Sequence, residues 1–110
     1  MTTRNDALQR ASRIKLMIFD VDGVLTDGAL YFNHEGEEFK VFNSLDGHGM
    51  RMLRESGVRL AIITGRKAPC VEWRMKNLRI DLLLQGVDDK LAALKGLLGE
   101  LGLSPEEAGF

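Results

Sequence analysis

The chain has 110 residues, 45% of them hydrophobic, and its 15 basic and 16 acidic side chains leave a formal net charge of -1. This length supports one domain with a modest core. A near-neutral charge gives no general attraction to nucleic acid or to anionic membranes, so we expect neither as a partner. The apolar runs are only a few residues long, well below the roughly 20 that span a bilayer.

The N-terminal segment and the cysteine content bear on where the protein resides. Residues 1–13 carry three arginines and no apolar core of signal-peptide length, and they suit a frayed or helical lead-in. The single cysteine, Cys70, cannot form an internal disulfide, which agrees with a reducing compartment. We therefore expect a cytoplasmic protein.

The first half of the chain predicts a buried strand followed by a hairpin. Residues 14–20 are mostly apolar and end in acidic and glycine residues, which favours a strand buried on both faces. Residues 29–33 and 38–43 are rich in Tyr, Phe and Val, and Gly36 lies in the loop of about four residues between them. This pattern predicts a β-hairpin. Residues 46–56 then suit a helix that ends at Gly57.

The second half alternates strands with helices. Strands are predicted over residues 58–64 and 81–85, and helices over residues 69–78 and from Asp88 or Asp89 to about Leu101. The sequence Ser104-Pro105-Glu106-Glu107 has the form of a capping box and predicts the beginning of another helix. The alternation indicates an α/β fold: a Rossmann-like parallel sheet flanked by helices, with the hairpin inserted after the first strand. Residues 1–110 form a single domain on this interpretation.

Two carboxylates follow the first predicted strand, in the sequence Asp20-Val21-Asp22-Gly23. A spacing of two places both side chains on the same side of an extended chain. Carboxylates this close repel each other unless a cation lies between them or one carries a proton. Mg²⁺ prefers oxygen ligands and commonly shares its shell with a substrate phosphate. The pair therefore suits phosphate chemistry, although a strand end followed by an Asp-Gly turn explains D-x-D-G alone equally well.

The longer string D-V-D-G-V-L-T-D-G resembles the first motif of the haloacid dehalogenase phosphatases, D-x-D-x-[TV]-L, including the buried strand before it. The resemblance implies that Asp20 is a nucleophile that forms an aspartyl-phosphate. It implies that Asp22 protonates the leaving oxygen and later activates water. Mg²⁺ would be held by an oxygen of Asp20 and by the backbone carbonyl of Asp22.

Two further motifs of that superfamily have counterparts in order along the chain. Thr64, in I-I-T-G-R at the end of the second predicted parallel strand, matches the Thr or Ser that donates to a phosphoryl oxygen, and Gly65 offers its backbone N–H. Lys90, in Q-G-V-D-D-K, matches the lysine that offsets negative charge in the transition state. Because ligands bind at the carboxyl ends of parallel strands, we expect these residues to meet Asp20 in one crevice.

The fourth motif of the superfamily, typically G-D-D-x-x-D, would complete the Mg²⁺ site. No such string follows Lys90, and Asp88-Asp89 precedes it. The chain thus resembles the first two-thirds of the superfamily's domain, and we expect it to be incomplete at its C-terminus.

The strings D-G-x-L-Y-F, F-N-S-L-D-G-H-G-M, I-I-T-G-R and Q-G-V-D-D-K together resemble the 3-deoxy-D-manno-octulosonate 8-phosphate phosphatases, a subclass with a short hairpin in place of a cap domain. This resemblance implies hydrolysis of a phosphorylated sugar acid in lipopolysaccharide core synthesis. It implies a homotetramer formed through the hairpin at residues 29–43. It further implies substrate contacts from the following residues: Asp46, Gly47, Gly65, Arg66 and Arg74.

Two alternatives stay open. Phosphatases of sialic-acid-type sugars carry similar strings. A non-catalytic assembly domain, like the phosphatase-like tail of some acylneuraminate cytidylyltransferases, would retain the fold without the activity. The presence of Asp20, Asp22, Thr64 and Lys90 favours the enzyme, and the missing acidic motif is the feature that separates the two classes.

Overall fold

The computed structural model describes residues 4–110. Its central feature is a four-stranded parallel sheet in the order β5-β4-β1-β6. The strands are β1 (Leu16–Phe19), β4 (Arg59–Ile63), β5 (Leu82–Leu84) and β6 (Ala108–Gly109). The predicted α/β class with a parallel sheet is confirmed.

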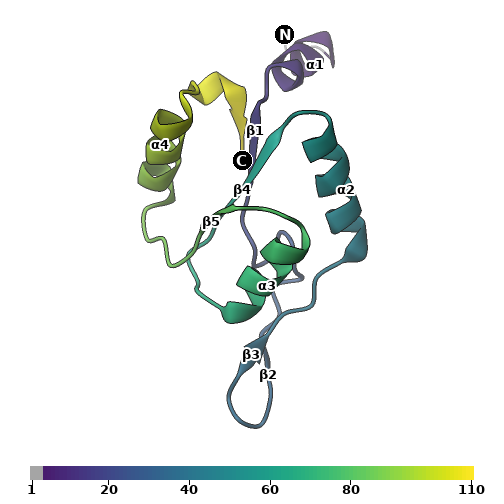
Figure 1. Cartoon of the computed structure of the whole chain (residues 1–110), viewed down its shortest axis with the longest axis vertical. Coiled ribbons are helices and arrows are strands. Elements are labelled where there is room, and N and C mark those ends of the chain that lie inside the picture. The colour runs from purple at the N-terminus through teal and green to yellow at the C-terminus, as the bar shows by residue number, and fades with distance from the viewer. Residues whose placement is uncertain (1–3) are drawn as a thin grey trace.

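Helices cover both faces of this sheet: α2 (Ser44–Glu55), α3 (Pro69–Asn77) and α4 (Lys90–Leu101). A further helix, α1 (Arg4–Ser12), precedes β1 and has no buried residue. Figure 1 shows α2 and α3 on one side of the strands and α4 on the other, with α1 at the end of the molecule opposite the hairpin. No helix among residues 4–110 is long and apolar enough to cross a membrane.

The alternation of side chains along β4 explains why its sequence is apolar without a break. Leu60 and Ile62 pack into the cluster beneath α2 and α3, together with Met50, Val71 and Met75. The residues between them, Ala61 and Ile63, belong to the cluster on the opposite face, with Leu16, Ile18, Leu97 and Leu98. A central parallel strand must be apolar on both faces for this reason.

Helix boundaries follow local capping chemistry. The side chain of Asn43 accepts from the backbone N–H of Leu45 and begins α2 two residues earlier than predicted. Asp89 caps α4 by accepting from the N–H of Ala92, and Gly102 ends that helix with a φ of 67°. The prediction for α4 is thereby confirmed.

The predicted hairpin is present but its paired strands are short. They are β2 (Tyr31–Phe32) and β3 (Glu38–Phe39), joined antiparallel with Tyr31 opposite Phe39. In the loop, the side-chain oxygen of Asn33 accepts from the N–H groups of Glu35 and Glu37, and Gly36 has a φ of 83°. The hairpin projects from one end of the molecule (Figure 1), whose extents are 52 × 28 × 28 Å.

The prediction of a helix that begins at Ser104 is wrong. The capping box is formed, yet only one 3-10 turn follows, at Pro105–Glu107, before the chain enters β6. Lys15 holds this turn to β1: its backbone N–H donates to the Glu107 carbonyl at 2.7 Å, and its ammonium lies 2.9 Å from the Glu107 carboxylate. Pairing of Ala108 with Leu16 then makes the chain extended. Sheet pairing thus overrides the local helix signal.

Candidate active site

The carboxyl ends of β1 and β4 bring Asp20 and Thr64 together. Asp20 comes directly after β1, and Thr64 directly after β4, whose register places Phe19 opposite Ile62. Thr64 is only 2% exposed, and its hydroxyl donates a hydrogen bond to the Asp20 carboxylate. The strand-end arrangement predicted from the sequence is therefore present in the structure.

Lys90 reaches the same point from the beginning of α4. Its ammonium donates to Oδ2 of Asp20 at 2.6 Å, across 70 positions of sequence. The loop before α4 is fastened to the strand end, because the N–H of Val87 donates to the carbonyl of Thr64 at 3.1 Å. This backbone contact fixes where α4 begins and so directs Lys90 toward Asp20.

The surroundings of Asp20 favour its ionised form. Partial burial by itself raises the pKa of the carboxyl, but three hydrogen bonds lower it by more. The donors are the ammonium of Lys90, the backbone N–H of Val21 at 2.7 Å and the hydroxyl of Thr64. The net effect places the pKa below its ordinary value of 3.8. A carboxylate kept ionised at neutral pH can act as a nucleophile.

The turn after Asp20 is organised by its own backbone and by one hydroxyl. The carbonyl of Val21 accepts from the N–H groups of Val24, Leu25 and Thr26. Oγ1 of Thr26 accepts from the N–H groups of Gly23 and Gly28, both of which have positive φ. These bonds reverse the chain immediately after Asp22, which keeps both carboxylates at the strand end.

Asp22 is engaged by a residue that the sequence analysis missed. Lys40 directly follows β3, and its ammonium donates to Oδ1 of Asp22 at 2.6 Å and to Glu38 at 3.0 Å. Only 2% of the Lys40 side chain is exposed. Burial lowers the pKa of Lys40, but its hydrogen bonds to Asp22 and Glu38 raise it by more, so the net shift is upward.

Arg66 is the fourth member of the cluster that Asp22, Glu38 and Lys40 form. Its guanidinium donates to Glu38 at 2.9 Å, and its Nε lies 3.9 Å from Oδ2 of Asp22. The pKa of Glu38 lies below its ordinary value, chiefly because of the hydrogen bond from Lys40. The residue predicted to meet a substrate carboxylate is thus bound to a carboxylate of the hairpin, beside the two aspartates.

The remaining predicted substrate residues form a second group, where α2 meets α3. Asp46 is exposed in the first turn of α2, whereas Gly47 is buried, and a Cβ there would lie 2.7 Å from Nη2 of Arg74. Arg74 donates to the carbonyl of Asn43 at 3.3 Å and lies over the ring of Phe42. Helix packing therefore already accounts for Gly47. At Gly65, by contrast, a Cβ would make only an ordinary contact of 3.5 Å with the Val87 carbonyl.

A signal for Lys40 does exist in the sequence. In the segment E-F-K-V-F, a period of two places Glu38 and Lys40 on one face and Phe39 and Val41 on the other. The structure inverts the usual pattern: the charged residues face inward, and Phe39 and Val41 are exposed. A lysine in register with an acidic residue on a hairpin beside two aspartates was the clue.

The metal-binding capacity of the described residues is limited. Across residues 4–110 no group of three or more His, Cys, Asp or Glu side chains is arranged to hold a metal ion. Asp20 and Asp22 provide oxygen atoms of the kind that Mg²⁺ prefers, and Mg²⁺ is often held by one or two carboxylates together with substrate phosphate. The donors present therefore suit this ion in kind and supply part of its coordination.

No protein-family model matches the chain. Among curated proteins, it is 47% identical over 106 residues to the 3-deoxy-D-manno-octulosonate 8-phosphate phosphatase of Yersinia pestis, covering 96% of this chain and 57% of that protein. The chain thus spans little more than half the length of this relative.

Solved structures give the same result. A probable phosphatase from Pseudomonas syringae matches with a TM-score of 0.91 and 56% identity, covering 94% of this chain and 59% of that one. The Moraxella catarrhalis 3-deoxy-D-manno-octulosonate 8-phosphate phosphatase, solved with magnesium, phosphate and the sugar acid, matches with a TM-score of 0.92 and 46% identity over 96% of this chain and 61% of that one. A protein described as a haloacid dehalogenase superfamily hydrolase, from Legionella pneumophila, matches with a TM-score of 0.91 and 40% identity over 94% of this chain and 57% of that one. By sequence and by fold, the chain is thus similar to phosphatases of the haloacid dehalogenase superfamily.

Proposed function

We propose that the chain carries the catalytic half-site of a phosphomonoesterase that acts on 3-deoxy-D-manno-octulosonate 8-phosphate. One observation carries this proposal: Asp20, at the end of β1, is held ionised by Lys90 at 2.6 Å and by Thr64, with Asp22 two residues later. The named activity of the Yersinia pestis and Moraxella catarrhalis relatives supports the choice of substrate. Its product would be an intermediate of lipopolysaccharide core synthesis.

In the first half of the proposed reaction, an oxygen of Asp20 attacks phosphorus. The bond between phosphorus and the sugar oxygen breaks, and protonated Asp22 gives its proton to that oxygen. Thr64 and the backbone N–H of Gly65 donate to phosphoryl oxygens, while Lys90 offsets their negative charge. Lys90 already lies within hydrogen-bond distance of Asp20, so it needs no rearrangement to act.

In the second half, water attacks the phosphorus of the aspartyl-phosphate. Asp22, now ionised, takes a proton from that water, and the bond between phosphorus and Asp20 breaks. Phosphate leaves, Asp20 is again a carboxylate, and Asp22 again carries a proton. One side chain thereby serves as acid and then as base, which requires that its carboxyl group be held in one place throughout.

Mg²⁺ would be held by an oxygen of Asp20 and the backbone carbonyl of Asp22. Bound there, it would reduce the repulsion between the nucleophile and the phosphate dianion. The magnesium in the Moraxella catarrhalis structure supports this choice of ion. The acidic pair typical of the superfamily is not found after Lys90, and we propose that such a pair completes the site in relatives.

We propose a homotetramer that assembles through the hairpin at residues 29–43. Four large apolar side chains of the hairpin are exposed: Leu30, Phe32, Phe39 and Val41. A lone hairpin is marginal in water, and a cluster of exposed apolar side chains usually marks an interface. The inverted pattern of β3, which turns charges inward and apolar groups outward, supports burial of the outer face against other copies of this chain.

The test is phosphate release with Mg²⁺ present. Two proteins are compared: the 110-residue chain, and a version extended by the C-terminal part of the Yersinia pestis relative that lies beyond the matched region. Substrates are the 8-phosphate of the eight-carbon sugar acid and the 9-phosphate of a sialic-acid-type sugar. We expect the extended version to turn over the eight-carbon substrate well and the 110-residue chain to turn it over poorly. Preference for the nine-carbon substrate would replace the proposed substrate, and no turnover by the extended protein would favour the non-catalytic alternative.

A further inference from the structure

The hairpin and the proposed acid-base residue are joined by one partly buried ion-pair cluster. Lys40 donates to Asp22 at 2.6 Å and to Glu38 at 3.0 Å, and Glu38 also accepts from Arg66 at 2.9 Å. These four side chains come from three separate parts of the chain: Asp22 from the turn after β1, Glu38 and Lys40 from the second arm of the hairpin, and Arg66 from the loop after β4. Lys40 is the central member, since it alone contacts both carboxylates within hydrogen-bond distance.

Burying a lysine is costly unless its charge is fully paired. Only 2% of the Lys40 side chain is exposed, whereas those of Asp22 and Glu38 are 27% and 16% exposed. A buried ammonium without partners would lose several kcal/mol of hydration. Asp22 and Glu38 both accept from the ammonium, which compensates for the lost hydration and fixes its position. A lysine exposed on the hairpin surface would be hydrated and would not need two carboxylate partners.

The two oxygens of Asp22 are in different surroundings. Oδ1 accepts the hydrogen bond from Lys40. Oδ2 lies 3.9 Å from the Nε of Arg66, which is beyond hydrogen-bond distance, and it accepts no hydrogen bond from any of residues 4–110. A protonated carboxyl group can accept at one oxygen while it donates from the other. The contact with Lys40 therefore fixes the orientation of the Asp22 carboxyl group and leaves Oδ2 as its open oxygen.

We propose that Lys40 is the positioning residue of Asp22: by holding Oδ1 it presents Oδ2 to the leaving oxygen, and Glu38 of the hairpin holds Lys40 in place. This inference rests on the proposed role of Asp22 as acid and base. It makes the hairpin part of the catalytic apparatus. A displacement of Glu38 in β3 would shift Lys40 and, through it, the carboxyl group of Asp22, because Lys40 is hydrogen-bonded to both.

The decisive experiment uses the extended protein described above and its variants, and it varies the leaving group. The specificity constant kcat/KM reports steps up to the first irreversible one, in which the acid protonates the leaving oxygen. An alkyl phosphate such as a sugar phosphate needs that proton, whereas p-nitrophenyl phosphate has a leaving group stable as an anion. We expect Lys40→Met to lower kcat/KM for the sugar phosphate by roughly 10- to 100-fold, part of the usual contribution of general acid catalysis. For p-nitrophenyl phosphate we expect a change of only about threefold.

Matched variants separate positioning from a structural role. Lys95→Met removes an exposed lysine of α4 and is expected to leave both constants unchanged. Glu38→Gln keeps the shape of the hairpin but weakens the grip on Lys40, so its loss should be smaller and equally selective for the sugar phosphate. Equal losses for both substrates in Lys40→Met, or no loss, would overturn the proposal.

A second measurement does not need turnover. In ¹⁵N NMR of lysine ammonium groups, Lys40 should exchange its protons slowly and show scalar coupling across hydrogen bonds to the carboxyl carbons of Asp22 and Glu38. Exchange as fast as that of Lys95 would refute the contact itself. If the extended protein and its Lys95→Met variant release no phosphate from either ester while Lys40 is protected, the proposed function fails and the contact stands without a catalytic role.

Discussion

The exposed face of the hairpin gives the clearest quantitative prediction, with Phe32→Asp as the perturbation. Phe32 is 54% exposed in the isolated chain. A Phe side chain carries roughly 200 Å² of surface, so about 100 Å² of the Phe32 surface is exposed in the isolated chain and would be buried in a tetramer. At ~25 cal/mol per Å² this corresponds to ~2.5 kcal/mol per subunit, or about a 70-fold weaker association per subunit. Four copies make ~10 kcal/mol per tetramer, before the added cost of burying a charge.

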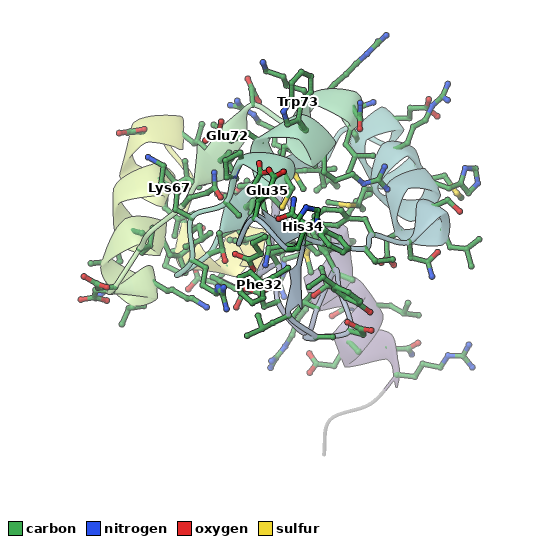
Figure 2. The ribbon with its side chains drawn as sticks, turned by 90° about the horizontal axis from the view of Figure 1, so that it is seen from below. Phe32, His34, Glu35, Lys67, Glu72 and Trp73 are labelled. Carbon is green, nitrogen blue, oxygen red and sulfur yellow. The ribbon has the colours of Figure 1, made fainter. Side chains whose placement is uncertain are left out.

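The assay is multi-angle light scattering at micromolar concentration. We expect wild type to form tetramers and Phe32→Asp to be largely monomeric. The matched control is Leu91→Asp on α4, where the side chain is 60% exposed but lies outside the hairpin. Figure 2, seen from the hairpin end, shows Phe32 and Trp73 of α3 on opposite sides of the hairpin-loop residues His34 and Glu35. A wild-type monomer, or equal dissociation of both variants, would refute the interface and the reasoning from exposure.

Three further predictions concern stability and the site. Ile62→Ala, at a fully buried position of β4, should lower the free energy of unfolding by about 2–5 kcal/mol, whereas Leu45→Ala, at a 75% exposed position, should change it by less than about 0.5 kcal/mol in urea titration. Because the pKa of Glu38 is lowered in the folded state from 4.5, its contribution to stability is present above that value and is lost as the pH falls through the folded pKa. Urea titrations at successively lower pH should therefore show a shallower acid loss for Glu38→Gln than for wild type, and equal slopes would contradict the assigned ion pairs. Thr64→Val, which removes the hydroxyl beside Asp20, should lower kcat/KM of the extended protein by roughly 100-fold, and Thr64→Ser should restore most of it; a fully active valine variant would remove Thr64 from the site.

The sequence predicted the sheet and the Asp20 cluster because both follow from general rules. Central parallel strands must be apolar on both faces, as β4 is, and their carboxyl ends share one edge, which brings Thr64 to Asp20. Lys90 was assigned from its resemblance to a superfamily motif, because a lysine at the beginning of a helix is by itself usually solvated. The sheet and the meeting of strand ends, by contrast, follow from local patterns and the topology that they imply.

What the sequence could not predict depends on long-range competition. The capping box at Ser104 favoured a helix, but pairing of Ala108 with Leu16 was available only in the folded sheet. Lys40 was missed because a lysine on a hairpin is usually solvated, and only the folded chain brings Asp22 to it across 18 positions. In each case a partner distant in sequence decides the outcome.

The central claim, that Asp20 is the nucleophile, is tested most directly by trapping the intermediate. The extended protein is mixed with its sugar phosphate, quenched in acid within one turnover and digested, and the peptide that contains Asp20 is analysed by mass spectrometry. The account predicts one added phosphoryl group on Asp20 in wild type, and neither the phosphoryl group nor phosphate release in Asp20→Asn, whose amide cannot act as the nucleophile. Turnover by Asp20→Asn with deamidation excluded, or a phosphoryl group on a different residue, would contradict the account.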